Sequence, residues 1–283
     1  MLKLLDRTIV SASERIVFLA PSSESVSDVF HNVEIDGFRH QQLVRDVQRM
    51  RGSIYVSDGA IQPHQLTTDG RHQMPEDETS WHLLLLNKEG RVAASALYLE
   101  HDNTVTFDEL RVRQCPLSED PQWRSTLVDS IEIELKRARR EQLVFVELAG
   151  WAVSEETRGT SSALAFAMAV YAFSRRAGGA LGMTTATFRH CSSTILKRFG
   201  GAHFEVDGVT VPPYFDPRYG CMMEMLRFDS RTPTSKYRYL IDQMRDTLAG
   251  IAVIARSPSR EAEAPFGMFS PVSARFERRV LAS

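Results

Sequence analysis

Cysteine is scarce in this chain of 283 residues, and long apolar runs are absent. The three cysteines show no C-x-x-C spacing, which argues against a disulfide framework or a cysteine zinc site and favours a reducing compartment. No run of about 18 apolar residues occurs, so a membrane-spanning helix is not expected. Charged residues interrupt the N-terminus, which lacks the pattern of a signal peptide. These absences predict a cytoplasmic protein without a transmembrane segment.

An excess of one charge is also lacking. The 34 Lys and Arg residues are balanced by 36 Asp and Glu residues, and the net charge is −2. Because a dedicated nucleic-acid binder needs a strongly basic field, nucleic acid is not an expected partner.

The eight histidines show no H-x-x-x-H or H-E-x-x-H spacing, so no metal site is predicted. His190 and His203 are interpreted as packing or surface residues. Cys191 is not assigned as a nucleophile, since catalytic pairs meet in space rather than in sequence.

The hydrophobic fraction of 43% is sufficient for a large core, and its periodicity predicts a mixed α/β fold. Helices are expected over residues 37–50, 121–141, 163–176, 192–199 and 235–249. Strands are expected over residues 81–86, 91–100, 104–112, 143–153, 181–188, 202–206 and 221–228, the first two joined as a hairpin by the turn NKEG. The domain is expected to span 31–249, with an N-terminal extension over 1–30 and a flexible tail over 250–283. Residues 57–80 are predicted to form a long loop, of the kind that builds lids and substrate walls.

The segment 146–168 holds the pattern most typical of a binding site. A strand runs into a tight turn that contains Arg158 and Gly159, and a helix begins there. The N–H groups at a helix start have no partner within the helix and lie at its positive end, so a pyrophosphate or phosphopantetheine phosphate would fit. Arg158 could add a charge-assisted contact. The alternative is an ordinary helix capped by Thr160 or Ser161, without a ligand.

This turn resembles the donor signature R/Q-x-x-G-x-G/A of the GNAT superfamily of N-acetyltransferases. The chain reads RGTSSA from Arg158, with Ser161 where the middle glycine is usual. A second GNAT landmark is approximated by HCSSTILKRFGGAHF, in which Leu196 stands in place of the general-acid tyrosine. The strand VELAGWAV is similar to the E-L-S-R-F-x-V strand of acyl-homoserine-lactone (autoinducer) synthases and related N-acyl amino acid synthases, with Gly150 in place of the arginine. The resemblance covers about residues 37–248.

The resemblance implies a GNAT-like, mostly antiparallel sheet flanked by helices, with a donor-binding core over about residues 81–204. It implies an acyltransferase that moves an acyl group, of medium or long chain, to the amine of an amino acid or similar small acceptor. The donor would be an acyl carrier protein phosphopantetheine thioester or acyl-CoA, and no metal is required. Glu147 is implied as the general base that deprotonates the amine. Strand alternation would place it on one face with Trp151 and Val153.

The backbone N–H groups after Glu147 are implied to hold the thioester carbonyl and its oxyanion. The donor-binding residues that the resemblance implies are Trp151, Ala152, Val153, Arg158, Gly159, Thr160 and Ser161. Glu109 is a secondary acid–base candidate, or else a solvated or paired glutamate. An acyl carrier protein would dock on a basic face, although the same residues also fit solvated helix ends. They are Arg137, Arg139, Arg140, Arg175, Arg176, Lys197 and Arg198.

Two alternatives stay open at this point. One is an acetyl-CoA-dependent GNAT acetyltransferase that acts on a small amine or a protein. The other is a non-catalytic module that keeps the fold and binds an acyl ligand, an interpretation motivated by the missing glycine and tyrosine.

Overall fold

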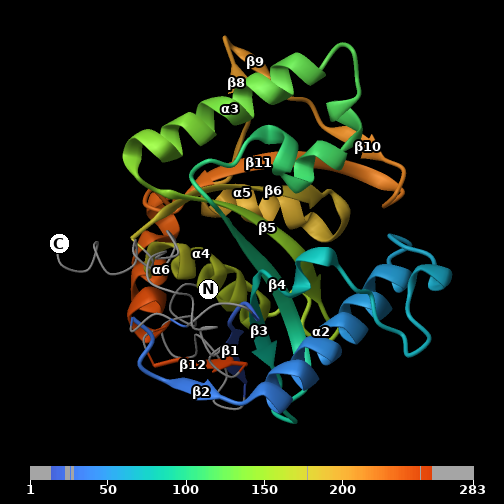
Figure 1. Cartoon of the computed structure of the whole chain (residues 1–283), viewed down its shortest axis with the longest axis vertical. Coiled ribbons are helices and arrows are strands. Elements are labelled where there is room, and N and C mark those ends of the chain that lie inside the picture. Colours follow the sequence, from blue (N-terminus) through green and yellow to red (C-terminus); the bar gives the residue numbers. More distant parts are fainter. Residues whose placement is uncertain (1–13, 23–25, 27–28, 177, 249, 257–283) are drawn as a thin grey trace, which may run out of the picture.

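The computed structural model describes residues 14–22, 26, 29–176, 178–248 and 250–256, and Figure 1 shows their arrangement. Ten strands build one sheet: β1 (Arg15–Leu19), β2 (Val33–Ile35), β3 (Trp81–Leu86), β4 (Val92–His101), β5 (Val144–Val153), β6 (Ala180–Thr187), β7 (Ala202–His203), β10 (Tyr214–Asp216), β11 (Cys221–Asp229) and β12 (Ala252–Ala255). Their order is β10-β11-β6-β5-β4-β3-β1-β12-β2, with β7 paired to β11 beside that path. A small second sheet joins β8 (Glu205–Val206) and β9 (Val209–Thr210).

The large sheet is mixed. The pairs β5–β6, β1–β12 and β12–β2 are parallel. The other pairs of this sheet are antiparallel, including the expected β3–β4 hairpin. The structure therefore confirms the predicted mixed, mostly antiparallel α/β fold.

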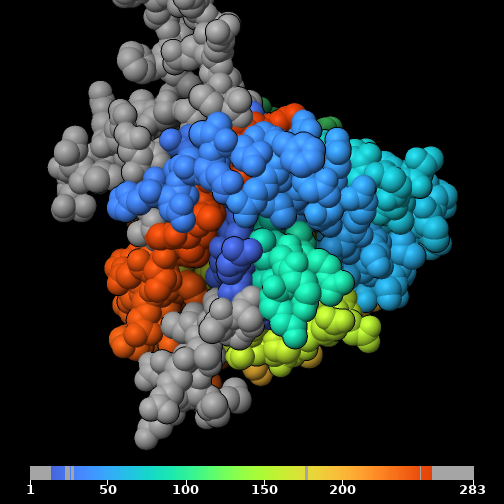
Figure 2. Space-filling model, turned by 90° about the horizontal axis from the view of Figure 1, so that it is seen from below, coloured from blue at the N-terminus to red at the C-terminus, as the bar shows by residue number. Residues whose placement is uncertain are grey.

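Helices cover both faces of the sheet. They are α2 (Gly37–Ser57), α3 (Arg124–Glu141), α4 (Ser161–Arg176), α5 (Ser192–Phe199) and α6 (Ser235–Leu248). On one face, α4 and α6 pack in the largest apolar cluster with β1, β3 and β4. On the other face, α2 packs over β1 and β3, whereas α3 packs over β5, β6 and β11. Figure 2, seen from below, shows the β3–β4 end of the sheet (teal) between α2 (blue) and the yellow-green residues around the start of α4.

The sequence of each main helix explains its position. α2 begins where the Asp36 carboxylate accepts the Arg39 N–H at 2.9 Å, and Leu43, Val44 and Val47 face the sheet. It extends to Ser57, past the predicted end at residue 50. α4 is apolar on nearly every face, and the prediction that it is buried is confirmed, because it lies between the sheet and α6.

The prediction of a strand over residues 104–112 is wrong. This segment forms two short 3-10 helices, η3 (Phe107–Glu109) and η4 (Arg111–Gln114), followed by η5 (Pro116–Ser118). The Glu109 carboxylate accepts both the N–H and the hydroxyl of Thr106, which turns the chain at that point. The alternating apolar residues that suggested a strand are instead buried against α3.

The two expected extensions also need correction where the structure describes them. Residues 15–19, placed in an N-terminal extension, form β1 between β3 and β12. Residues 252–255, placed in a flexible tail, form β12 between β1 and β2. These strands are buried and pair in parallel with partners distant in sequence, so local patterns did not reveal them. The rest of the predicted tail, from residue 257, lies outside the described residues.

Within the described part of the chain, no helix has the length and apolarity needed to cross a membrane.

Candidate active site

The candidate site lies where two parallel strands of the sheet separate. β5 and β6 pair from Val144 and Ala180 as far as Leu148 and Thr184. β5 then continues to Val153 and β6 to Thr187 without pairing to each other. Thr185 is exposed although β6 is an inner strand. We call this stretch, residues 149–153 of β5 opposite residues 185–187 of β6, the β5–β6 opening; both strands are labelled in Figure 1.

A β-bulge lies on the β5 side of this opening. Between the pairs Ser95–Ala152 and Leu97–Ala149, β5 has one residue more than β4. The extra residue is accommodated at Gly150, which adopts φ +58°. A glycine in this conformation is typical of a bulge that re-aims the residues beyond it.

The bulge corrects the predicted face of β5. Glu147 and Phe145 lie on the side of α3 and η4. Beyond the bulge, Trp151 and Val153 belong to the α4 side, where the Trp151 ring packs 5.5 Å from Phe166. Glu147 therefore does not share a face with Trp151 and Val153, because one inserted residue reverses the strand alternation.

Glu147 is buried and holds three hydrogen-bond donors. Its Oε2 accepts the Arg111 N–H at 3.0 Å and lies 3.0 Å from His101 Nε2. Its Oε1 accepts the Val112 N–H at 3.2 Å. The carboxylate thus ties η4 to the sheet, two residues before the opening begins. A carboxylate offers about four lone-pair sites, so one remains for a water or a substrate proton.

The turn after β5 has the predicted geometry of a strand–turn–helix unit. Gly159 adopts φ +73°, and α4 begins at Ser161. The Thr160 hydroxyl accepts the Ala163 N–H at 3.3 Å, so Thr160 caps the helix as expected for the alternative without a ligand. The Ser162 hydroxyl donates to the carboxylate of Glu14. A carboxylate from the chain itself therefore already lies at the positive end of α4.

Arg158 is likewise paired within the chain. Its two terminal nitrogens donate to the Asp58 carboxylate at 3.1 and 2.8 Å, a bidentate contact with the residue after α2. Its Nε donates to the Val153 carbonyl at 3.0 Å. His190 Nε2 lies 3.1 Å from Arg158 Nη1 and 3.2 Å from Asp58 Oδ1. The structure thus brings Arg158 to the end of β5, where the Asp58 carboxylate is its charge partner.

Polar residues that sequence reasoning missed lie beside the bulge on the α2 side. Arg51 is fully buried and pairs with Asp77, with 2.8 Å between Nη2 and Oδ2. Burial alone would raise the pKa of Asp77, but the Arg51 guanidinium outweighs it and lowers that pKa. Arg51 Nη1 lies 3.3 Å from the position that a Cβ on residue 150 would take. From the last turn of the same helix, Tyr55 Oη donates to the Trp151 carbonyl at 3.2 Å. A predicted helix that continued the apolar spacing as far as Ser57 would have included Tyr55.

The secondary candidates lie apart from the opening. Glu109 is exposed, and the Thr106 N–H that it accepts lowers its pKa. Much of the predicted basic face is neutralised within the chain: Arg137 pairs with Glu134, Glu141 and Asp229, Arg175 with Asp242, and Lys197 with Glu224. Among the described residues, no group of three or more His, Cys, Asp or Glu residues has the geometry of a metal site.

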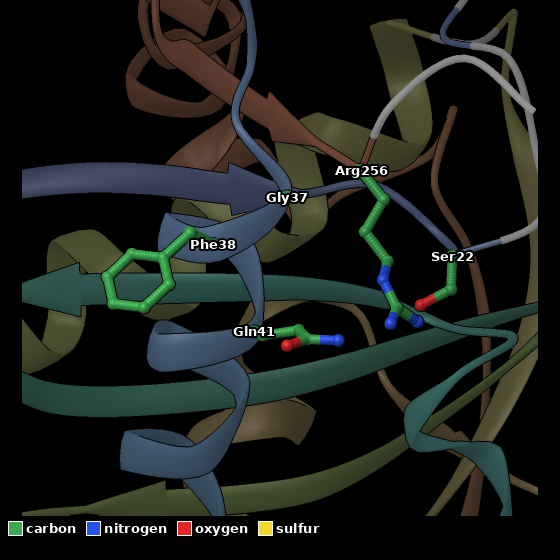
Figure 3. Close-up of a pocket in the computed structure, with 5 residues that line it drawn as sticks. All are labelled: Ser22, Gly37, Phe38, Gln41 and Arg256. Atoms are coloured by element: carbon green, nitrogen blue, oxygen red, sulfur yellow. The ribbon is translucent and has the colours of Figure 1, made fainter.

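A hollow of about 520 Å³ lies elsewhere, beside the N-terminus of α2 (Figure 3). It is lined by Ser22, Gly37, Phe38, Gln41 and Arg256. The hollow is open to solvent and shares no residue with the β5–β6 opening. None of the predicted site residues lines it.

Comparison with solved structures relates this arrangement to known proteins. A CoA-dependent acyl-homoserine lactone synthase, BjaI, with SAM and isopentyl-CoA, matches 94% of this chain and 99% of its own chain, with a TM-score of 0.52 and 15% identity. The structure of the same enzyme with MTA covers the same share of each chain, with a TM-score of 0.51 and 15% identity. The chain shares the fold of this synthase. This confirms at the level of the fold the resemblance predicted from residues 37–248.

The N-acyl amino acid synthase FeeM, from uncultured soil microbes, matches 73% of this chain and 94% of its own, with 12% identity and a TM-score of 0.45. No family model matches this chain, and no curated protein does.

Proposed function

We propose that this protein is an N-acyltransferase that moves an acyl group from a thioester donor to the amine of an amino acid or similar small acceptor. The observation that carries the proposal is the β5–β6 opening. In the middle of an otherwise paired sheet, β5 and β6 leave backbone groups free to meet an extended ligand. A phosphopantetheine arm, whether of CoA or of acyl carrier protein, has the length for that position and carries carbonyl oxygens that can accept from the N–H groups of β5. The synthase with the same fold is CoA-dependent.

The donor would lie with its phosphates at the start of α4. The amides of Gly159, Thr160 and Ser161 stand at the positive end of this helix. The Thr160 N–H, which donates to the Thr157 carbonyl at 3.2 Å, would exchange that carbonyl for a phosphate oxygen. Arg158 would exchange Asp58 for a donor phosphate. The thioester would then extend into the opening, where the N–H groups of β5 after Gly150 could receive its carbonyl oxygen.

In the reaction, the acceptor nitrogen attacks the thioester carbonyl carbon and forms a tetrahedral oxyanion. The carbon–sulfur bond then breaks, an amide forms and a free thiol is released. The nitrogen loses a proton, which we assign to Glu147 through a water. Glu147 lies on the α3 side at the base of the opening, and one lone-pair site of its carboxylate is left by its three donors.

The test is incubation with acyl-CoA and acyl carrier protein thioesters of several chain lengths, together with pooled amino acids and amines. Mass spectrometry should detect an N-acyl product with release of an equal amount of thiol. Absence of product with every donor contradicts the proposal. Glu147→Gln should slow transfer at least about tenfold, whereas Glu205→Gln, an exposed glutamate on β8, should not. An unchanged rate in Glu147→Gln would refute the role of Glu147 alone.

The packing of Trp151 on Phe166 favours a second candidate, transfer of a short acyl group such as acetyl. These rings fill the α4 side of the opening, where a long acyl chain would otherwise enter. The two candidates separate in the same assay. An acetyltransferase would use acetyl-CoA and lose activity as the chain lengthens, whereas a fatty acyl synthase would show the opposite trend.

A further inference from the structure

The peptide groups of β5 after Gly150 have a fixed orientation. The Ser154 N–H donates to the Ala93 carbonyl at 2.8 Å, and this bond determines which residues of β5 form backbone hydrogen bonds with β4. Because successive residues of an antiparallel strand face opposite sides, Ala152 directs its backbone groups toward β4. Trp151 and Val153 therefore direct theirs into the β5–β6 opening.

A side-chain hydroxyl reinforces this orientation at the bulge. Ser95, which is buried on β4, donates its hydroxyl to the Gly150 carbonyl at 3.3 Å. In a trans peptide the N–H points opposite to the carbonyl of the same unit. The Trp151 N–H therefore points away from β4, and a carbonyl that accepts a hydrogen bond makes that N–H a better donor.

Both carbonyls that face the opening are already occupied. Tyr55 donates its hydroxyl to the Trp151 carbonyl at 3.2 Å, and Arg158 Nε donates to the Val153 carbonyl at 3.0 Å. An ordinary strand edge offers donors and acceptors in alternation, and it therefore attracts another strand. Here side chains cap the acceptors, and the N–H groups of Trp151 and Val153 are left for a ligand.

We propose that Tyr55 is a positioning residue that acts together with Ser95. They leave this stretch of β5 with N–H donors and no free carbonyl, a donor-only edge that is specific for a group that only accepts hydrogen bonds. In the proposed function, on which this inference rests, that group is the thioester carbonyl and its oxyanion. Along a strand, N–H groups that face the same side are about 6.6 Å apart, so the oxygen lies against one of these two donors. That donor stabilises the negative charge that develops on the oxygen. The same edge does not match an amide N–H of a peptide or of the pantetheine arm, since neither carbonyl is left to accept it.

The chemistry of Tyr55 fits positioning rather than proton transfer. Burial raises the pKa of its phenol above the usual value, with a further contribution from Tyr219 nearby. The hydroxyl therefore keeps its proton throughout the working pH range and remains a donor to the Trp151 carbonyl. Removing it should lower the rate without changing the shape of the pH profile.

The test uses infrared difference spectra of octanoyl-CoA labelled with 13C at the carbonyl, bound without an acceptor. Hydrogen bonds from the donor-only edge should lower the carbonyl stretching frequency relative to the thioester in water. In Tyr55→Phe this lowering should shrink by about half, and kcat should fall about tenfold with the donor KM changed less than about twofold. Tyr239→Phe, an exposed tyrosine on α6, is the matched control and should behave as the wild type.

Ser95→Ala provides a second variant with a smaller change in volume, and it should reduce the frequency shift in the same direction. If the labelled thioester binds but both variants show the wild-type frequency, the donor-only edge is refuted while the proposed function stands. If the wild-type protein shows no bound carbonyl band with octanoyl-CoA, with acetyl-CoA or with octanoyl acyl carrier protein, the proposed function fails and this inference fails with it.

Discussion

Substitution of Gly150 by alanine tests the bulge on which the site depends. A Cβ at this position would lie 2.7 Å from Leu97 Cγ and 2.9 Å from Leu97 Cδ1. Leu97 is 1% exposed, so its side chain is enclosed by neighbouring groups. Overpacking of this kind costs roughly 1–3 kcal/mol, and the left-handed φ of +58° adds roughly 1–2 kcal/mol for a residue with a Cβ. The free energy of unfolding should therefore fall by about 2–5 kcal/mol.

Gly159→Ala is the matched control for this prediction. Gly159 also has a left-handed φ, of +73°, but a Cβ there would meet nothing within 4 Å. The two variants share the backbone strain and the reduced entropy of the unfolded chain. Their difference therefore isolates the clash with Leu97, at roughly 1–3 kcal/mol. Urea unfolding measures both. Equal losses in the two variants would refute the packing that we describe at the bulge.

The remaining predictions concern charge and access. His82 is fully buried, and burial lowers its pKa from 6.5 to about 4. The folded state therefore binds fewer protons than the unfolded chain between these values, and stability should fall by about 3 kcal/mol as pH drops from 6.5 to 4, most simply measured by urea unfolding. Asp58→Asn should strengthen binding of CoA about fivefold in calorimetry, since it frees Arg158 from a partly buried ion pair worth about 1 kcal/mol. Cys191 is exposed and should react with a thiol reagent well before Cys115, whose pKa burial raises.

Each of these three predictions has a result that would contradict it. His82→Gln should flatten the pH dependence of stability, and a slope equal to that of the wild type would show that other groups cause it. Unchanged or weaker CoA binding in Asp58→Asn would mean that Asp58 does not compete with the donor, and Asp46→Asn, in an exposed ion pair of α2, is the control. Rapid labelling of Cys115 in the folded protein would contradict its burial under η5 and α3.

Local patterns predicted the parts of the fold whose cause is local. The apolar helix α4 and the β3–β4 hairpin each follow from a short stretch of sequence. The strands β1 and β12 could not be found in this way, because they are defined by pairing with each other across more than two hundred residues. Residues 104–112 alternate like a strand, yet the Glu147 carboxylate binds the N–H groups of Arg111 and Val112 and stabilises a helical turn.

The candidate site shows the same division. Glu147, Arg158 and the start of α4 were predicted from a strand, a turn and a helix in sequence. The opposite faces of Glu147 and Trp151 follow from one bulge at Gly150. A glycine inside a strand often marks a bulge, so Gly150 was a signal for this bulge in the sequence. Tyr55 and Asp58 come from a helix distant in sequence, and tertiary packing alone brings them to the end of β5.

A crystal structure with an acyl-CoA analogue that carries a methylene group between sulfur and carbonyl tests the central claim most directly, because this ligand cannot transfer its acyl group. We predict that its carbonyl oxygen lies in the β5–β6 opening at about 2.7–3.2 Å from the backbone nitrogen of Trp151 or Val153. Its phosphates should contact Arg158 in place of Asp58. An analogue bound elsewhere, such as in the hollow beside Arg256, or with its carbonyl turned away from β5, would contradict the account.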